Sequence, residues 1–214
     1  MNLDFSAIGN QKNLLAFSAG VDSSALFFLL LTQNIPFDIA IVDYNLREQS
    51  KEEISYAKEL ALKYNKSIFI KDVKLENSSN FEKIARDIRY KFFEEIILEN
   101  SYENLITAHQ LNDKLEWFFM QLSKGAGLVE LIGFNEFEQK ENYKIYKPLL
   151  NITKDELEIY LKENNHKYFI DNSNFDEKYK RNYFRHNFSN KFLEEFSSGI
   201  KKSFDYLQND LNSL

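Results

Sequence analysis

Short runs of β-forming residues alternate with longer amphipathic segments up to about residue 124. Strands are expected at residues 13–18, 37–43, 67–73 and 104–109. Helices are expected near residues 22–33, 50–64, 80–99 and 112–124. Four strands separated by helices of this length predict an α/β fold with a doubly wound parallel sheet, which has helices on both faces. Ligands of such sheets bind beyond the carboxyl ends of the strands, so the residues that end the strands are the first site candidates.

The alternation weakens after Gly133. Residues 144–150 predict an edge strand that ends at Pro148. A capping box at Thr153 opens a helix to about Asn165, and an amphipathic segment runs from about 190 to 211. We therefore expect a first domain over residues 1–133. Residues 134–214 are expected to be its C-terminal part, with the edge strand and a short helical extension but no separate C-terminal domain.

Composition excludes several classes of protein. The 214 residues include no cysteine, which excludes disulfides, thiolate metal sites and Fe–S clusters held by this chain. No stretch approaches the ~20 apolar residues of a membrane span, and the first residues do not have the pattern of a signal peptide. These features predict a cytoplasmic protein that does not bind membranes.

The charge distribution is more informative than the net charge of −6, which argues against a general nucleic-acid binder. Residues 178–191 contain five lysine and arginine residues, no acid, and interleaved aromatic residues. This basic segment fits phosphate contact or base stacking, although a solvated helix face has the same pattern.

The turn at residues 18–24, Ser-Ala-Gly-Val-Asp-Ser-Ser, joins the first expected strand to the first expected helix. Such a turn directs backbone N–H groups and the positive end of a helix dipole at one point, which favours a phosphate group. Asp22 would repel that phosphate unless Mg²⁺ lies between them. Alanine adopts positive φ values poorly, so Ala19 is expected either in an ordinary region or under strain.

A second group of polar residues follows the fourth expected strand. If a helix begins near Asn112, Asp113 and Glu116 share one face and converge with His109. These side chains fit Mg²⁺ or a substrate ammonium group. The alternative is an Asn112 cap followed by an acid in the first helical turn.

The turn resembles the PP-loop, S-G-G-x-D-S, of the N-type ATP pyrophosphatases, with Ala19 in place of a glycine. Further segments resemble, in order, the motifs of the tRNA(Ile)-lysidine synthetase family. They are residues 42–47 with Ser50 and Glu53, then 81–90, 109–116, 124–128, 147–150, 171–174 and 181–185. Besides Ala19, the departures from the family pattern are Tyr44, Asn45, Asn112, Trp117 and Lys147.

The resemblance implies an ATP-dependent ligase that joins free L-lysine to C2 of the wobble cytidine of tRNA(Ile). ATP would adenylate the base with release of pyrophosphate, and the lysine amine would then displace AMP. Many members of the family also carry C-terminal domains that help to hold the tRNA, and a chain of 214 residues is expected to have no such separate domain. A homodimer is a further expectation.

Residue roles follow from the same resemblance. The expected ATP-binding residues are Ser18, Ala19, Gly20, Val21, Asp22, Ser23 and Val42, with Asp22 as the Mg²⁺ ligand. The expected catalytic residues are Asp22, His109, Asp113 and Glu116. The expected phosphate or tRNA contacts are Arg86, Arg89, Arg181 and Arg185, since the guanidinium fork matches phosphate oxygens.

Two alternatives remain from the sequence. One is another PP-loop enzyme, a tRNA thiolase or an amidating synthetase. The absence of cysteine counts against sulfur transfer, and an amidotransferase would need a glutaminase partner. The other is a nucleotide-binding module that has kept the fold without the activity.

Overall fold

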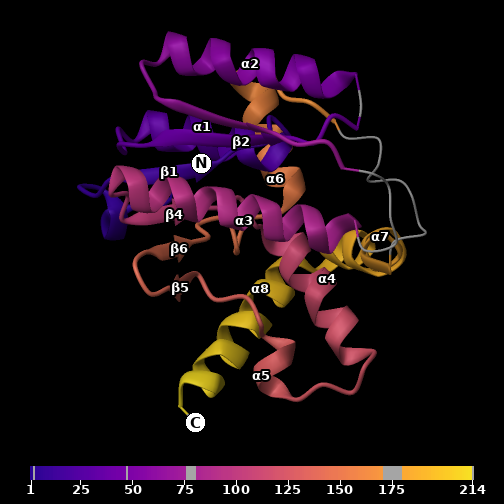
Figure 1. Cartoon of the computed structure of the whole chain (residues 1–214). Helices are drawn as coiled ribbons and strands as arrows, with labels where there is room; N and C mark the ends of the chain where they lie inside the picture. The colour runs from indigo at the N-terminus through magenta and orange to yellow at the C-terminus, as the bar shows by residue number, and fades with distance from the viewer. Residues whose placement is uncertain (2, 47, 76–80, 171–179, 214) are drawn as a thin grey trace.

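The computed structural model describes residues 1, 3–46, 48–75, 81–170 and 180–213. Within them a six-stranded sheet has the order β3-β2-β1-β4-β6-β5. All neighbouring strands are parallel except β5, which is antiparallel to β6 (Figure 1). The strands are β1 (Asn13–Ala16), β2 (Asp38–Asp43), β3 (Ile68–Asp72), β4 (Asn104–Ile106), β5 (Phe137–Gln139) and β6 (Lys144–Tyr146).

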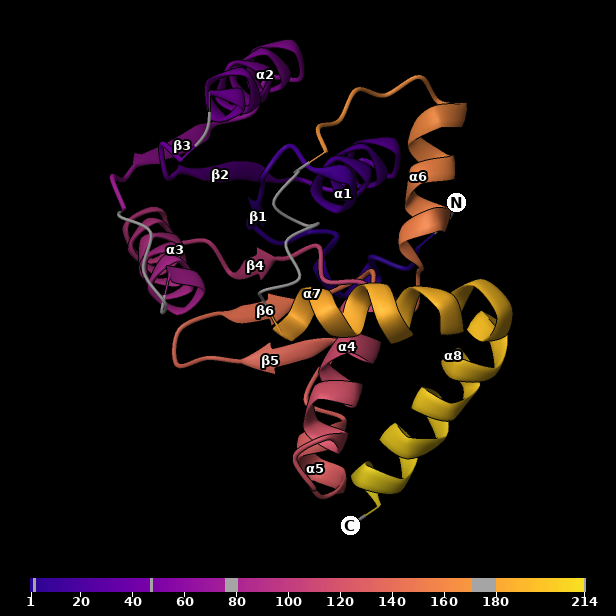
Figure 2. The same ribbon diagram turned by 90° about the vertical axis from the view of Figure 1, so that its right-hand side faces the viewer.

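Helices cover both faces of the sheet, as predicted for a doubly wound fold (Figure 2). One face packs against α1 (Val21–Thr32), α2 (Gln49–Lys63) and α6 (Lys154–Glu163), and the other against α3 (Phe81–Asn100). The remaining helical elements are η1 (Ser6–Ile8), α4 (Leu111–Leu122), α5 (Leu128–Leu131), α7 (Lys180–Phe184), the π-helical turn η3 (Arg185–Ser189) and α8 (Asn190–Asn212).

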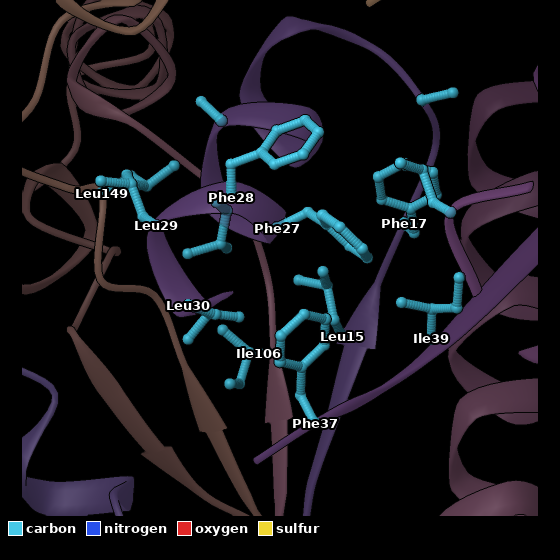
Figure 3. Close-up of a cluster of buried hydrophobic side chains, with 14 of the residues drawn as sticks. Leu15, Phe17, Phe27, Phe28, Leu29, Leu30, Phe37, Ile39, Ile106 and Leu149 are labelled. Carbon is cyan, nitrogen blue, oxygen red and sulfur yellow. The ribbon is translucent and has the colours of Figure 1, made fainter. Parts of the chain in front are cut away.

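Successive side chains of β1 point to opposite faces of the sheet, and a separate hydrophobic cluster packs on each face. Leu15 points to the α1 face, where Phe27 and Leu30 from α1 meet Ile39 and Ile106 from the sheet (Figure 3). Leu14 points to the α3 face. The middle of α1 is buried nearly all round because it lies between the sheet and α6, which explains its almost wholly apolar sequence. Each fully buried Leu or Phe contributes about 1.5–3 kcal/mol.

Four helices end in the same backbone motif with a residue other than glycine in the left-handed conformation. The residues with positive φ are Asn34, Asn65, Ser101 and Asn165, each one or two positions past the end of its helix. In each case the next N–H donates to a carbonyl five residues earlier, as Ile35 does to Leu30 (3.0 Å). Asparagine tolerates the left-handed region better than most residues, so it takes the place that glycine usually occupies.

The predicted edge strand at residues 144–150 is wrong in two respects. The strand ends at Tyr146, and it lies between β4 and β5 rather than at an edge. Pro148 follows the strand and limits its length without marking an edge. The edge is β5, which is too short to give an alternating pattern.

The C-terminal elements pack beyond the sheet. Leu111 and Leu115 of α4 form a small core with Leu193 and Phe204 of α8. Among the described residues, no helix is long and apolar enough to cross a membrane. The motif segment 171–174, and Arg47 and Lys178 of the other predicted segments, lie outside the described residues.

Candidate active site

The order in which the chain adds strands to the sheet changes side at β1, since β2 lies on one side of β1 and β4 on the other. The strands β1, β2 and β3 proceed one way, and β4 begins on the other side of β1. Crevices at such a reversal are the usual ligand sites of open α/β sheets. The turn after β1 and the segment after β4 therefore end side by side, and they carry the two predicted groups of polar residues.

The turn after β1 is organised by its own hydroxyl groups. The Ser18 N–H donates to Ser23 Oγ (3.2 Å), and the two serine hydroxyls share a hydrogen bond of 3.1 Å. Gly20 occupies the N-cap position of α1 and provides no side chain to cap it. The first turn of α1 is therefore suited to an anionic ligand.

Ala19 adopts the strained conformation that the sequence left open. Its φ is +59°, in the left-handed region, and its side chain is fully buried. The Phe169 N–H donates to the Ala19 carbonyl oxygen (2.9 Å), and Gly20 pairs with Phe169 as an isolated parallel bridge. The segment before residue 171 thus fixes the turn from outside.

Asp22 lies in the first turn of α1 with an unusual environment for a carboxylate. Its Oδ1 is buried and accepts no hydrogen bond from the described residues. Burial, together with repulsion from Asp113 and Glu116, raises the pKa of Asp22 to about 7, although Lys154 and Arg185 oppose the shift. A buried carboxylate oxygen without a partner is a good ligand for a hard cation, so this site fits Mg²⁺.

The helix after β4 starts one residue earlier than predicted, and its cap is Gln110 rather than Asn112. Gln110 Oε1 accepts from the Asn112 N–H (2.5 Å), and Asp113 Oδ2 accepts from the Gln110 N–H (3.0 Å). Asn112 instead joins three elements: its Oδ1 accepts from the Lys154 N–H (3.1 Å) and its Nδ2 donates to Asn190 Oδ1 (3.1 Å). An aspartate at this position has no N–H to donate to Asn190.

His109 is held beside the start of α4. A hydrogen bond of 2.9 Å joins its Nδ1 to Thr107 Oγ1, and its ring packs edge-on against Phe134 at 5.4 Å. Burial lowers the pKa of His109 to about 4, because the attraction of Asp113 only partly compensates. His109 is therefore neutral at neutral pH.

Asp113 and Glu116 face the basic segment rather than open space. Arg181 Nε donates to Glu116 Oε2 (2.8 Å), and Arg181 also bonds to Asp113. Arg185 Nε donates to Glu116 Oε1 (2.6 Å). Glu116 is fully buried, so this cluster of two acids and two arginines is a partly desolvated ion-pair network.

Burial alone would raise the pKa of Asp113. Arg181, His109 and the Gln110 N–H outweigh that effect and hold the pKa below its usual range. Asp113 therefore stays charged and can hold a cationic group. In the part of the chain that the structure describes, no three His, Asp or Glu side chains cluster closely enough to hold a metal ion.

The other predicted contacts lie around the ends of β2 and α3. Val42 is half-buried near the end of β2. Tyr44 donates its hydroxyl to the Ala85 carbonyl (2.8 Å), which ties the end of β2 to α3. Arg86 is exposed and lies over the Tyr90 ring at 4.5 Å, whereas Arg89 is half-buried near Tyr44.

Sequence reasoning missed three contributors. Lys154 acts on Asp22 from the start of α6, Phe169 fixes the turn at Ala19, and Gln110 caps α4. The capping box at Thr153 marked a helix start, but no sequence signal placed that start beside Asp22. Phe169 contacts the turn through its backbone N–H, which every residue except proline has, so its residue type could not reveal this contact.

Comparison with known proteins agrees with this arrangement. Residues 3–192 match the family model described as PP-loop domain. The chain is 56% identical over 203 residues to a tRNA(Ile)-lysidine synthase of Campylobacter jejuni strain RM1221, covering 95% of this chain and 63% of that protein. A tRNA(Ile)-lysidine synthase of Helicobacter pylori strain 26695 is 49% identical, with 95% of this chain and 60% of that protein covered.

A solved structure shares the fold at much lower identity. It is the U34-tRNA thiolase NcsA from Methanococcus maripaludis with its [4Fe-4S] cluster, with a TM-score of 0.74, 18% identity, and coverage of 96% of this chain and 74% of that one. The chain spans less than two thirds of the length of the two synthases compared above. Since the PP-loop model matches most of the chain and the turn at residues 18–24 has the geometry described above, the chain belongs to the PP-loop domain family.

Proposed function

We propose that this chain ligates free L-lysine to C2 of the wobble cytidine of tRNA(Ile), with ATP as the second substrate. The observation that carries the proposal is electrostatic: Asp22 lies in the phosphate-suited turn, its Oδ1 accepts no hydrogen bond from the described residues, and its charge interacts with those of Asp113 and Glu116. One centre can therefore hold both a nucleotide and an amine. The similarity to proteins named tRNA(Ile)-lysidine synthase supports this choice.

Nucleotide binding is assigned to the turn. The first N–H groups of α1 and the hydroxyls of Ser18 and Ser23 would hold the β- and γ-phosphates of ATP, and Val42 would lie against adenine. Asp22 would hold Mg²⁺, which supplies neutralising charge for the phosphates when it is bound. The cytidine O2 would attack the α-phosphate and release pyrophosphate.

Amine attack is assigned to the residues after β4. Asp113 and Glu116 would hold the lysine ε-ammonium in exchange for part of their contact with Arg181 and Arg185. An amine attacks only as the neutral base, so the ammonium group would first transfer one proton to a carboxylate oxygen of Glu116 or Asp113. His109, neutral and held by Thr107, would accept a hydrogen bond that orients the amine. The amine would then attack C2, and AMP would leave.

Further expectations belong to the same proposal. Residues 1–133 and 134–214 would act as two parts of one catalytic unit, since β5 and β6 extend the sheet and α7 contacts α4. Arg86, Arg89, Arg181 and Arg185 would contact phosphate or tRNA. A cytoplasmic location and a homodimer stay predictions.

The test is nucleoside analysis of tRNA(Ile) after incubation with the protein, ATP, Mg²⁺ and isotopically labelled lysine. Lysidine carrying the label is the expected product, with one AMP per lysidine. The Asp22→Asn variant, which keeps the size of the side chain, should form AMP at least ~100-fold more slowly. The proposed function would be overturned if the wild-type protein left the tRNA unlabelled and the Asp22→Asn variant released AMP at a near-normal rate.

A further inference from the structure

The helices α1, α4 and α6 all begin at the carboxyl edge of the sheet, and their first turns are joined to one another. The Leu111 N–H donates to the Ile152 carbonyl (2.9 Å), which holds the start of α4 beside the segment that leads into α6. Asn112 Oδ1 accepts from the Lys154 N–H (3.1 Å), which joins the first turns of the same two helices. Figure 2 shows α6 alongside α1, against which it packs. The positive ends of three helix dipoles therefore lie at one edge of the sheet.

The first turn of α1 contains two buried polar atoms that have no hydrogen-bond partner among the described residues, Asp22 Oδ1 and Ser24 Oγ. Ser24 is fully buried. Buried polar groups are nearly always paired in folded proteins, so two unpaired groups in one helical turn indicate contact with a ligand or its bound cation. Residues 18–24 contain no lysine or arginine, in contrast to the Walker loop, whose lysine reaches the phosphates of the nucleotide.

Lys154, in the first turn of α6, is a cation close to this turn. Its charge acts on Asp22 more strongly than that of Arg185 does. Arg185 and Arg181 are both engaged by Glu116, at 2.6 and 2.8 Å. Lys154 is half-buried, and no described residue forms a hydrogen bond or an ion pair with its ammonium group. Lys154 can therefore bind an anionic ligand without giving up an ion pair with a described residue.

We propose that Lys154 binds the phosphate group held by the turn at residues 18–24, and so supplies from α6 the cation that a Walker loop carries within the loop. The lysine ammonium is a compact charge that suits phosphate oxygens. The backbone fixes the position of Lys154, because its N–H is held by Asn112 and the capping box at Thr153 orders the first turn of α6.

In the proposed reaction, the ammonium group of Lys154 would offset the negative charge of the departing pyrophosphate. This inference rests on the proposed function for ATP as the ligand. For the anion site itself it rests on the joined helix starts and on the two buried atoms without partners.

The test is a calorimetric titration with inorganic pyrophosphate in the presence of Mg²⁺, without tRNA and lysine. Lys154→Met keeps the length of the side chain and removes its charge. The Kd for pyrophosphate should rise by about tenfold or more, the scale of one charge-assisted hydrogen bond. Lys154→Gln, a second uncharged variant, should change the Kd in the same direction, and Lys154→Arg should restore most of the affinity. All three variants keep the backbone N–H that donates to Asn112.

Controls separate phosphate binding from a general change in the site. Lys162→Met removes a cation near the other end of α6, where the side chain is 64% exposed, and should leave the affinity for pyrophosphate unchanged. Adenosine has no phosphate and should bind the wild type and Lys154→Met equally well. Thermal melting of each variant establishes that it is folded. Unchanged pyrophosphate affinity in both uncharged variants, or an equal loss of affinity for adenosine, would overturn the inference.

Lysidine formation, measured separately, distinguishes this inference from the proposed function. Pyrophosphate binding that depends on Lys154, in a protein that forms no lysidine, would support the inference and reject the proposed function. Lysidine formation with the same KM for ATP in Lys154→Met as in the wild type would support the proposed function and reject the inference.

Discussion

At the scale of single residues, Asp22 has an environment that opposes its charge. Its pKa of about 7 lies above the unfolded value of 3.8, so the folded state binds the proton more tightly between these pH values. Stability must therefore fall as the pH rises from about 4 to about 7. Asp22→Asn removes this effect, and we expect it to raise the free energy of unfolding by ~1–3 kcal/mol at pH 8. The difference from wild type should vanish near pH 4.

Urea denaturation at pH 4, 6 and 8, without nucleotide or Mg²⁺, measures this difference. Because His109 is present in both proteins, its own titration cancels in the comparison. A variant that is less stable than wild type at pH 8 would show that Asp22 makes a favourable contact in the folded protein.

Ala19 presents a second conflict at the residue scale. Glycine at φ +59° would relieve about 1–2 kcal/mol of backbone strain. It would also remove a buried methyl group worth about 0.8 kcal/mol and would raise the conformational entropy of the unfolded chain, and both of these effects lower stability. We therefore expect Ala19→Gly to change the free energy of unfolding by less than ~1 kcal/mol. Ala19→Val should lower it by more than ~2 kcal/mol, since a β-branched residue is an outlier at positive φ. Equal stability of the two variants in urea denaturation would contradict the strain.

At the scale of elements, the docking of α7 and η3 on α4 depends on charge as well as packing. Removing both arginines leaves the fully buried Glu116 without its cations, so Arg181→Ala with Arg185→Ala should lower the free energy of unfolding by ~3–5 kcal/mol. Adding Glu116→Gln should recover part of that loss, because the uncompensated charge is then removed. A double-mutant cycle in urea checks this coupling, and strictly additive losses would argue against it.

Most helices and strands of the first part of the chain could be predicted from the sequence. The helices α1 to α4 lie within a few residues of the predicted ranges because each carries a long apolar or amphipathic pattern, and the strands β1 to β4 were found as short apolar runs between these helices. The strand β5 was missed because its sequence, Phe-Glu-Gln, is no apolar run, and its absence placed the 144–150 segment wrongly at an edge. The turn at residues 18–24 was predicted as a strand-to-helix connection from local spacing alone. The pairing of Glu116 with Arg185 depends on a contact across 69 positions, which no local pattern encodes.

At the scale of the whole molecule, the net charge of −6 repels tRNA, so any attraction must come from local groups of cations. The basic segment contributes less than its composition suggests, because Arg181 and Arg185 are already engaged by Asp113 and Glu116. Arg86 is exposed at the start of α3 and acts electrostatically on His109, and Arg89 lies one helical turn further. These two arginines are therefore the better candidates for phosphate contacts near the site.

We expect Arg86→Gln with Arg89→Gln to weaken tRNA binding and to make its salt dependence shallower. Two lost phosphate contacts should reduce the slope of log K against log salt by about 1.4–1.8, at roughly 0.7–0.9 per contact. The matched control is Lys58→Gln with Lys63→Gln, which removes two exposed cations from α2 on the opposite face of the sheet. Filter binding across a salt series measures both slopes. If the control reduces the slope as much as the arginine variant, the attraction is a general effect of net charge, and α3 has no specific role in binding tRNA.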